Sequence, residues 1–288
     1  MGRIKRGWRL TKQSWAVVKS DKSLLAFPII SVVAAIITMI IFFGGGIGVA
    51  VATGSPWGAL PLVIIGAYLL TVVGVFASVA LASCATEALE GRQTTVGQGI
   101  SAARGRMKLV LAWAAVALFV GLLISVIQGL LEEVAGGLAS AIVGGLAGFA
   151  WAVATFFVIP VIAIDGLGPK EALKTSAHVV KERWGEGVVG SSAIGLITFF
   201  VAILPAFVII FLGFVLAGSS AVGGGLLIAV GVLVFVVALL FQSTIMAVFR
   251  VALYRYATED KVLGGFDRDG LESAFVAKKS RRGALGGA

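Results

Sequence analysis

Six long stretches of apolar residues, none containing a charged side chain, set the pattern of this chain. They are residues 24–52, 59–83, 109–131, 138–164, 188–217 and 222–249. The shortest, 109–131, would rise about 34 Å as an α-helix, more than the ~30 Å thickness of the hydrocarbon core of a membrane. Uncharged runs of this length are typical of transmembrane helices, so the pattern predicts an all-α protein with six membrane spans.

Basic residues occur only in alternate segments between these runs. Residues 1–23, 84–108, 165–187 and 250–288 hold 7, 4, 4 and 8 Lys and Arg residues, whereas the connections at 53–58, 132–137 and 218–221 hold none. Cytoplasmic loops of membrane proteins carry an excess of Lys and Arg. The alternation therefore predicts a multi-pass protein of the cell membrane with both its N- and C-termini in the cytoplasm.

The composition excludes an ordinary soluble protein, because 59% of the residues are hydrophobic and only 13% are charged. The net charge is +9. The basic residues adjoin the spans, where anionic lipid head groups are the nearest counterions, so nucleic acid is not an expected partner. We predict one transmembrane domain over residues 1–257 and a mostly disordered cytoplasmic tail over residues 258–288.

Amphipathic stretches precede the first, third and fifth runs and predict two or three interfacial helices on the cytoplasmic face. Ile4, Trp8, Thr11, Trp15 and Val18 recur with helical spacing in the first stretch, and basic residues flank them. A similar stripe from Leu173 to Trp184 forms the third. The side chains expected to meet lipid or a partner are Lys5, Arg6, Trp8, Arg9, Lys12, Trp15, Lys170, Lys174, Lys181 and Trp184.

The second stretch, Val96 to Met107, has the same spacing, although three glycines weaken it as a helix. Equivalent positions in the three stretches are 85 and 77 residues apart, and residues 11–19 share five identities with residues 173–181. Two explanations stay open. One is an internal threefold repeat of interfacial helix, span, outer turn and span; the other is independent convergence on amphipathic helices.

Small residues recur at every fourth position into and along the fourth run. They are Gly136, Ser140, Gly144, Gly148 and Ala152. Such a ridge lets two helix backbones approach closely in lipid. The predicted helix-packing contact lies either inside one bundle or between subunits. In the fifth run, Pro205 predicts a kink.

Residues suited to catalysis or metal binding are scarce. The chain has one histidine, His178, and one cysteine, Cys84, which are too few for an ordinary zinc site. Ser176 and His178 are two residues apart, so they do not face each other on one helix. The six runs contain no Asp, Glu, Lys, Arg or His that could couple transport to protons. We therefore predict that the protein is not an enzyme and has no cofactor, catalytic residue or metal site.

The segment from Pro160 to Glu186 resembles a signature of an uncharacterised family of six-span bacterial membrane proteins. The matching residues are Pro160, Asp165, Gly168, Glu171 to Lys174, Ser176, Lys181 and Trp184 to Glu186. The tryptophans near the N-terminus and the segment from Ala252 to Ala257 are also similar to that family. The resemblance implies a shared fold and a cell-membrane location. It implies no activity and no site residue, because the family is a domain of unknown function.

Two functional hypotheses follow. The first is a non-enzymatic membrane protein that organises lipid or partner proteins through its basic cytoplasmic face. Its expected partners are membrane lipids, above all anionic ones, and a membrane or cytoplasmic protein. The second is a transporter or channel for a small or apolar solute, which Pro205 and the glycine-rich spans favour. A cavity that reaches past the middle of the membrane would favour the second hypothesis, and a tightly filled bundle would favour the first.

Overall fold

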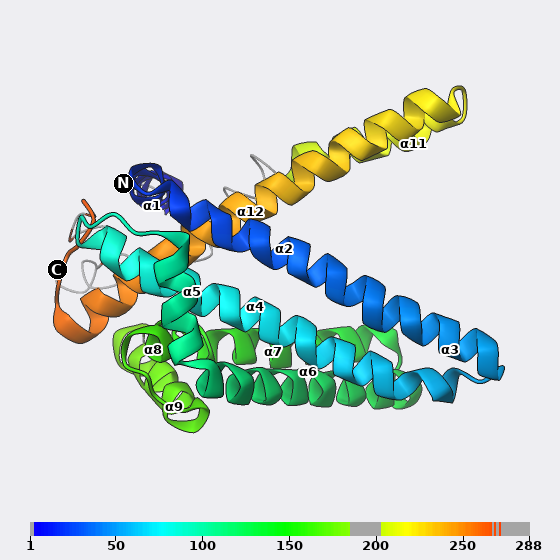
Figure 1. The fold of residues 1–288 in the computed structure, drawn as a ribbon, viewed down its shortest axis with the longest axis horizontal. Helices are drawn as coiled ribbons and strands as arrows, with labels where there is room; N and C mark the ends of the chain where they lie inside the picture. Colours follow the sequence, from blue (N-terminus) through cyan, green and yellow to red (C-terminus); the bar gives the residue numbers. More distant parts are fainter. Residues whose placement is uncertain (1–2, 185–202, 267, 269–270, 272–288) are drawn as a thin grey trace, which may run out of the picture.

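Three pairs of long apolar helices extend from a common base (Figure 1). The computed structural model describes residues 3–184, 203–266, 268 and 271, and the regular secondary structure within them is helical throughout. We call the base, which carries α1, α5, α9 and the last turns of α12, the basic end. The opposite tips, where the two helices of each pair are joined, are the far end.

The first pair begins with a nearly continuous helix from Lys22 to Thr53. It consists of a 3₁₀ turn η1 (Lys22–Leu25), α2 (Ala26–Thr38), a π-helical segment η2 (Met39–Gly44) and α3 (Gly45–Thr53). Gly54 then takes a left-handed conformation with a φ of 63°, which glycine adopts without steric strain. The chain turns there into η3 (Pro56–Ala59) and α4 (Leu60–Leu89), the second helix of the pair.

The second pair is formed by α6 (Met107–Ala135) and by α7 (Gly137–Ala154) with α8 (Val158–Ile164). Gly136, with a φ of 83°, makes the turn at the far end. Three turn residues separate α7 from α8, so the predicted fourth span is interrupted near the basic end. The hydroxyl of Ser176 pairs with the backbone at this break: it donates to Ala154 O over 2.6 Å and accepts from Phe157 N over 3.0 Å.

The third pair is formed by α11 (Leu204–Ala217) and α12 (Ala221–Glu259). The predicted fifth span starts at residue 188, outside the described residues, and Pro205 lies in the first turn of α11. In the part of the chain that the structure describes, five segments are long and apolar enough to cross a membrane: Lys22–Thr53, Pro56–Leu89, Met107–Val134, Gly137–Ile164 and Ala221–Glu259. The protein is therefore an all-helical membrane protein, and the sixth span stays a prediction.

Helices form at all three predicted amphipathic stretches: α1 (Arg3–Ser20), α5 (Val96–Gly105) and α9 (Pro169–Val179), which continues as the π-helical η4 (Val180–Trp184). In α5 the side chains of Thr95 and Gln98 form a capping box, which stabilises the first turn despite the glycines.

The faces of α1 and α9 that contact the rest of the protein match the predicted stripes only in part. In α1, Leu10, Ser14 and Val17 are buried together with Val18 of the predicted stripe, whereas Trp8 is 50% exposed. In α9, Ala172, Ser176 and Val179 are buried, and Ala177 is exposed. In both helices the buried face is therefore centred about one position before the predicted stripe, and stripe residues such as Trp15, Leu173 and Val180 are partly buried at its edge.

Each helix at the basic end packs on the second helix of one pair. Helix α5 packs on α4, α9 on α8, and α1 on α12. Helix α1 comes first in the chain and α12 belongs to the last pair, so this contact closes a ring of three. The aligned positions Ser14, Gly99 and Ser176 are all buried in these contacts. Equivalent packing favours the internal repeat, because convergence on amphipathic sequences would not also require equivalent packing partners.

The hydrophobic core lies at the basic end. Phe157, Val161, Phe249 and Leu253 are inaccessible to solvent there. Phe266 and Leu271, from the predicted tail, also belong to this core, and residues 272–288 lie outside the described part of the chain.

Toward the far end the helices diverge and expose bulky apolar side chains. Ile40 is 68% exposed, Phe119 67% and Leu226 66%. Exposed apolar surface of this extent is rare on proteins in water, and in a membrane it contacts lipid.

Candidate functional site

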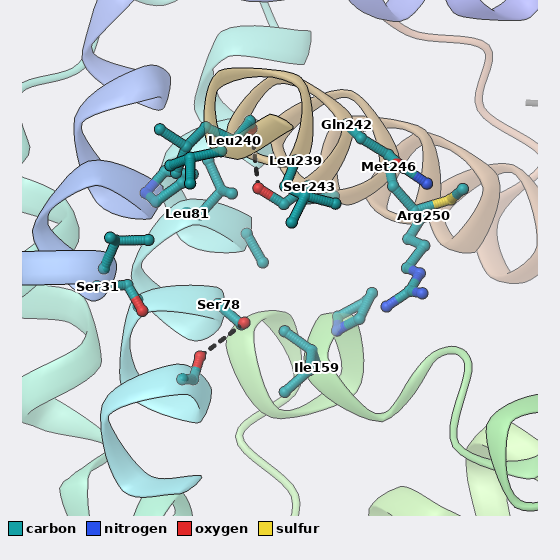
Figure 2. A pocket seen from close by; sticks show the side chains of 18 residues that line it. Ser31, Ser78, Leu81, Ile159, Leu239, Leu240, Gln242, Ser243, Met246 and Arg250 are labelled. Atoms are coloured by element: carbon teal, nitrogen blue, oxygen red, sulfur yellow. Dashed lines mark hydrogen bonds between the residues drawn. The ribbon is translucent and has the colours of Figure 1, made fainter. Parts of the chain in front are cut away.

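A cavity of about 660 Å³ lies where the first and third helix pairs meet α8, near the basic end (Figure 2). Its walls come from α2, α4, α8 and α12, and they are mostly apolar. They include Pro28, Val32, Leu81, Ala82, Ile159, Pro160, Val236, Leu239, Leu240, Met246 and Ala247. Helix α12 leans away from α2 and α4 (Figure 1), so α12 contacts these two helices only near the base. The cavity lies where α12 separates from them.

One cationic side chain, Arg250 of α12, lines this cavity in the described structure. Figure 2 shows it reaching from α12 toward the helix that carries Ile159. The residue is partly buried, and its Nε is buried without a hydrogen-bond partner among the described residues. Its guanidinium lies 4.8 Å from the ring centroid of Phe156, a cation–π distance.

The other polar side chains of the cavity are Ser31, Ser78, Ser243 and Gln242. Ser78 and Ser243 donate their hydroxyls to backbone carbonyls of their own helices, at Gly74 and Leu240 (Figure 2), as hydroxyls in membrane helices commonly do. The Oε1 atom of Gln242 is buried without a partner in the described part of the chain. Gln242 and Arg250 are eight residues apart on one helix, so they share a face of α12.

The cavity occupies the half of the helical bundle nearer the basic end. Its lining extends to Val236 on α12 and to Gly74 on α4, and both residues lie near the middle of their helices. Residues from the far ends of the pairs do not contribute to it. Among the described residues it is therefore a pocket that ends near the middle of the helices and does not continue to the far end.

The predicted basic surface is an exposed feature of the basic end. Lys12 of α1, Lys170 and Lys174 of α9, and Lys181 of η4 are all exposed, and none of them forms an ion pair within the described structure. Arg9 is partly buried. Lys5 and Arg6 belong to α1, and Trp184 is the last residue of η4. The structure describes the backbone of these three residues but not their side chains.

The two described tryptophans of this surface differ in their surroundings. Trp8 is 50% exposed and available to lipid or a partner. Trp15 is partly buried, and its ring meets that of Phe241 in α12 edge-on, with 5.3 Å between the centroids. The Trp15 side chain therefore contributes to the contact that closes the ring of helices.

The small-residue ridge divides into two parts. Ser140 Oγ donates to Gln128 O of α6 over 2.7 Å, and Gly144 is buried against the Gln128 side chain. Gly136 forms the turn before α7, and Gly148 and Ala152 are not buried. Close packing of α6 on α7 thus involves Ser140 and Gly144, within one chain.

A second cavity, of about 510 Å³, opens at the basic end between α4, α5 and α8. Its charged groups are largely paired with each other: Arg92 forms ion pairs with Glu87 and Glu90, and Arg106 Nη2 donates to Ile164 O over 3.3 Å. Among the described residues, no group of three or more potential metal ligands comes together. The first cavity, with an unpaired cation in apolar surroundings, is therefore the stronger candidate site.

The sequence pattern does not mark Arg250 as a site residue. Arg250 directly follows the last uncharged run, so the pattern places it in the cytoplasmic segment. The structure continues α12 without a break to Glu259, which keeps Arg250 on a membrane helix. The spacing of Gln242, Met246 and Arg250, at steps of four, is the sequence signal that could have placed it on one face with the apolar wall.

Comparison with known proteins agrees with the resemblance noted in the sequence. No curated protein and no solved structure matches the chain. A family of unknown function, DUF6159, matches residues 58–265, from η3 to the core residues that follow α12. Because the match covers well over half of the chain, the protein belongs to the DUF6159 family of unknown function.

Proposed function

We propose that this protein is a non-enzymatic protein of the cell membrane whose basic end faces the cytoplasm and organises anionic lipid around the helices. One observation carries the proposal: Lys12, Lys170, Lys174 and Lys181 are exposed and lack ion-pair partners within the described structure. Cations left free beside membrane helices are available to lipid phosphates.

The expected attraction is large enough to enrich anionic lipid. Each Lys or Arg near an anionic membrane surface contributes about 1 kcal/mol, and salt weakens the attraction. Trp8, exposed on the same end, suits the head-group level, where the amphipathic tryptophan ring is preferred. The same surface would suit an acidic protein partner, which the following experiment separates from lipid.

The test changes all four lysines to Gln and, in a charge-preserving control, all four to Arg. Both variants and the wild type are reconstituted in nanodiscs of mixed phosphatidylcholine and phosphatidylglycerol, and the lipid retained on extraction is counted by native mass spectrometry. We expect the Gln variant to lose its enrichment in phosphatidylglycerol at low salt and the Arg variant to keep it. Equal enrichment in all three proteins would refute the lipid function.

The orientation needs a separate test, because the proposal places the basic end in the cytoplasm. Cysteines introduced at Lys12 and at Glu133 are treated with a membrane-impermeant maleimide; the native Cys84 is buried. We expect Glu133→Cys to react in intact cells and Lys12→Cys only after permeabilisation. The opposite pattern would reverse the proposed topology.

A second candidate function, transport of a small or apolar solute, is favoured by the 660 Å³ cavity. The cavity ends near the middle of the helices, which suits a bound molecule better than a continuous path. Uptake of carboxyfluorescein, a small anionic dye that Arg250 would not repel, into proteoliposomes checks this candidate. Protein-dependent uptake that Val236→Trp abolishes would favour transport over lipid organisation.

A further inference from the structure

The cavity beside α12 has the dimensions and polarity of an amphipathic molecule. Helix α12 rises about 21 Å between Arg250 and Val236, which mark the two ends of its lining. The cation stands at the end nearer the base, and the walls between the two residues are lined mainly by Leu239, Leu240, Met246 and Ala247. A ligand with one anionic end and one apolar end matches this distribution.

Among the described residues, Arg250 has little of the compensation that a guanidinium in this position requires. Charged groups within membrane helices are costly and normally pair with another charge or with backbone carbonyls. In the described structure no carboxylate pairs with Arg250, and its guanidinium lies over the ring of Phe156. A single aromatic face returns only part of the cost of removing the cation from water.

A second unpaired polar group lies on the same face of α12. The Oε1 atom of Gln242 is buried without a partner among the described residues, two helical turns from Arg250. Of the serine hydroxyls of the cavity, those of Ser78 and Ser243 are bonded to their own helices, whereas that of Ser31 on α2 forms no hydrogen bond among the described residues. Among the described lining residues, the polar side-chain atoms that are fully buried without a partner therefore lie on the helix that carries the cation.

We propose that this cavity binds one anionic phospholipid, with its phosphate on Arg250 and an acyl chain along α12 toward Val236. The proposal rests on the proposed function for the class of lipid, and it adds a discrete internal site to the surface enrichment. Phosphate suits a guanidinium because the planar fork can donate two hydrogen bonds to it. The apolar walls favour a lipid over a free phosphate ion, which would leave them empty.

The experiment measures how slowly a single phosphatidylglycerol molecule leaves the protein. Wild type and variants are loaded with isotopically labelled phosphatidylglycerol in nanodiscs and chased with unlabelled lipid, and the retained label is counted by native mass spectrometry. We expect about one slowly exchanging lipid per chain in the wild type, and its release to be accelerated about tenfold or more in Arg250→Gln. Arg104→Gln, which removes an exposed arginine of α5, is the matched control and should retain the lipid.

A second variant tests the apolar part of the site without changing a charge. Gly74 lines the cavity, and a Cβ added there would meet no atom within 4 Å. Gly74→Leu should therefore fold normally, fill the cavity and lose the retained lipid although Arg250 is intact. Arg250→Gln changes a residue that also contacts Phe156, so thermal unfolding is measured for each variant. If Arg250→Gln does not fold, the lipid retention of the folded Gly74→Leu protein is the test of the site.

The outcomes separate this site from the basic surface and from a simple anion site. An unchanged release rate in folded Arg250→Gln, or equal retention of phosphatidylcholine, would overturn the lipid site. Retention in Gly74→Leu together with displacement by inorganic phosphate would also overturn it, in favour of a free anion. The variant with four lysines changed to Gln should lose surface enrichment and keep the slow lipid, so either proposal can fail while the other stands.

Discussion

Arg255 of α12 and Glu90, the residue that follows α4, form an ion pair of 2.8 Å that joins the last helix pair to the first. Arg255 is only 13% exposed, and its other terminal nitrogen bonds Glu259 over 3.1 Å. Glu90 in turn pairs with Arg92. The guanidinium therefore connects two carboxylates at the base, where the three helix pairs converge.

We expect Arg255→Gln to lower the free energy of unfolding by about 1–3 kcal/mol, between the values typical of exposed and of buried pairs. Arg255→Lys should recover only part of this, because one ammonium cannot hold both glutamates in the same geometry. The measurement is thermal or denaturant unfolding in detergent, with a double-mutant cycle that includes Glu90→Gln. Lys261→Gln is the control, since Lys261 is 58% exposed and, among the described residues, pairs only with Glu259. A coupling energy near zero would contradict the assigned role.

Two serines at equivalent positions of the first and third amphipathic stretches should respond differently to the same change. Ser176 is inaccessible to solvent and bonds both Ala154 O and Phe157 N at the break between α7 and α8. Ser176→Ala would remove the hydroxyl that bonds both backbone groups, so we expect a loss of about 2 kcal/mol in unfolding free energy. Ser14 is equally buried, but its hydroxyl has no hydrogen-bond partner among the described residues.

Ser14→Ala removes an unsatisfied polar group and should therefore be neutral or slightly stabilising. Comparing the unfolding midpoints of the two alanine variants under identical conditions checks this contrast. Equal losses in both would mean that packing of the hydroxyl, and not its hydrogen bonds, sets the cost at these positions.

The same two serines illustrate which features of the fold the sequence does not predict. The spans were predictable because an uncharged run longer than the membrane is thick has few other stable conformations. The buried faces of α1 and α9 were not, because close helix contacts at the base use Ser14, Ala172 and Ser176, which hydrophobicity alone does not single out. Bulky residues such as Trp8 remain exposed instead, where lipid is an equally good solvent for them.

The cavity could not be predicted for a related reason. It depends on the angle at which α12 leaves the base, which no local pattern encodes. Arg250 follows the apolar run directly, and the sequence does not reveal whether that position faces the cytoplasm or a gap between helices. Only the packing of α8 and α12, with Phe156 beside the guanidinium, assigns Arg250 to the cavity.

Gly144 and Gly148 offer a matched pair within the ridge of small residues. A Cβ on Gly144 would lie 1.7 Å from Nε2 of Gln128, whereas a Cβ on Gly148 would meet no atom within 4 Å. We expect Gly144→Val to push α7 away from α6 and cost about 1–3 kcal/mol, and Gly148→Ala to change stability little. Unfolding in detergent measures both. Destabilisation by Gly148→Ala that depends on protein concentration would show that this part of the ridge contacts a second chain.

Asp21 makes the stability of the basic end depend on pH. Its carboxylate accepts hydrogen bonds from Ser23 N over 3.0 Å, and from Thr94 N and Oγ1 over 2.7 and 2.6 Å, and so joins the start of η1 to the loop before α5. Burial alone would raise the pKa of this carboxyl, but the hydrogen bonds from Ser23 and Thr94 outweigh it and lower the pKa below its usual value.

Because the folded state has the lower pKa, the unfolded state takes up the proton first as the pH falls. The stability that Asp21 contributes is therefore fully present above its ordinary pKa of about 3.9 and is lost as the pH falls through the lower folded value. We expect Asp21→Asn to cost about 2 kcal/mol near neutral pH, because an amide cannot accept all three hydrogen bonds, and the gap from the wild type to close below about pH 4. Unfolding of both proteins in detergent across the acidic range measures this gap, with the exposed Glu133→Gln as control. A gap that stays constant with pH would mean that the Asp21 charge adds nothing beyond the shape of the side chain.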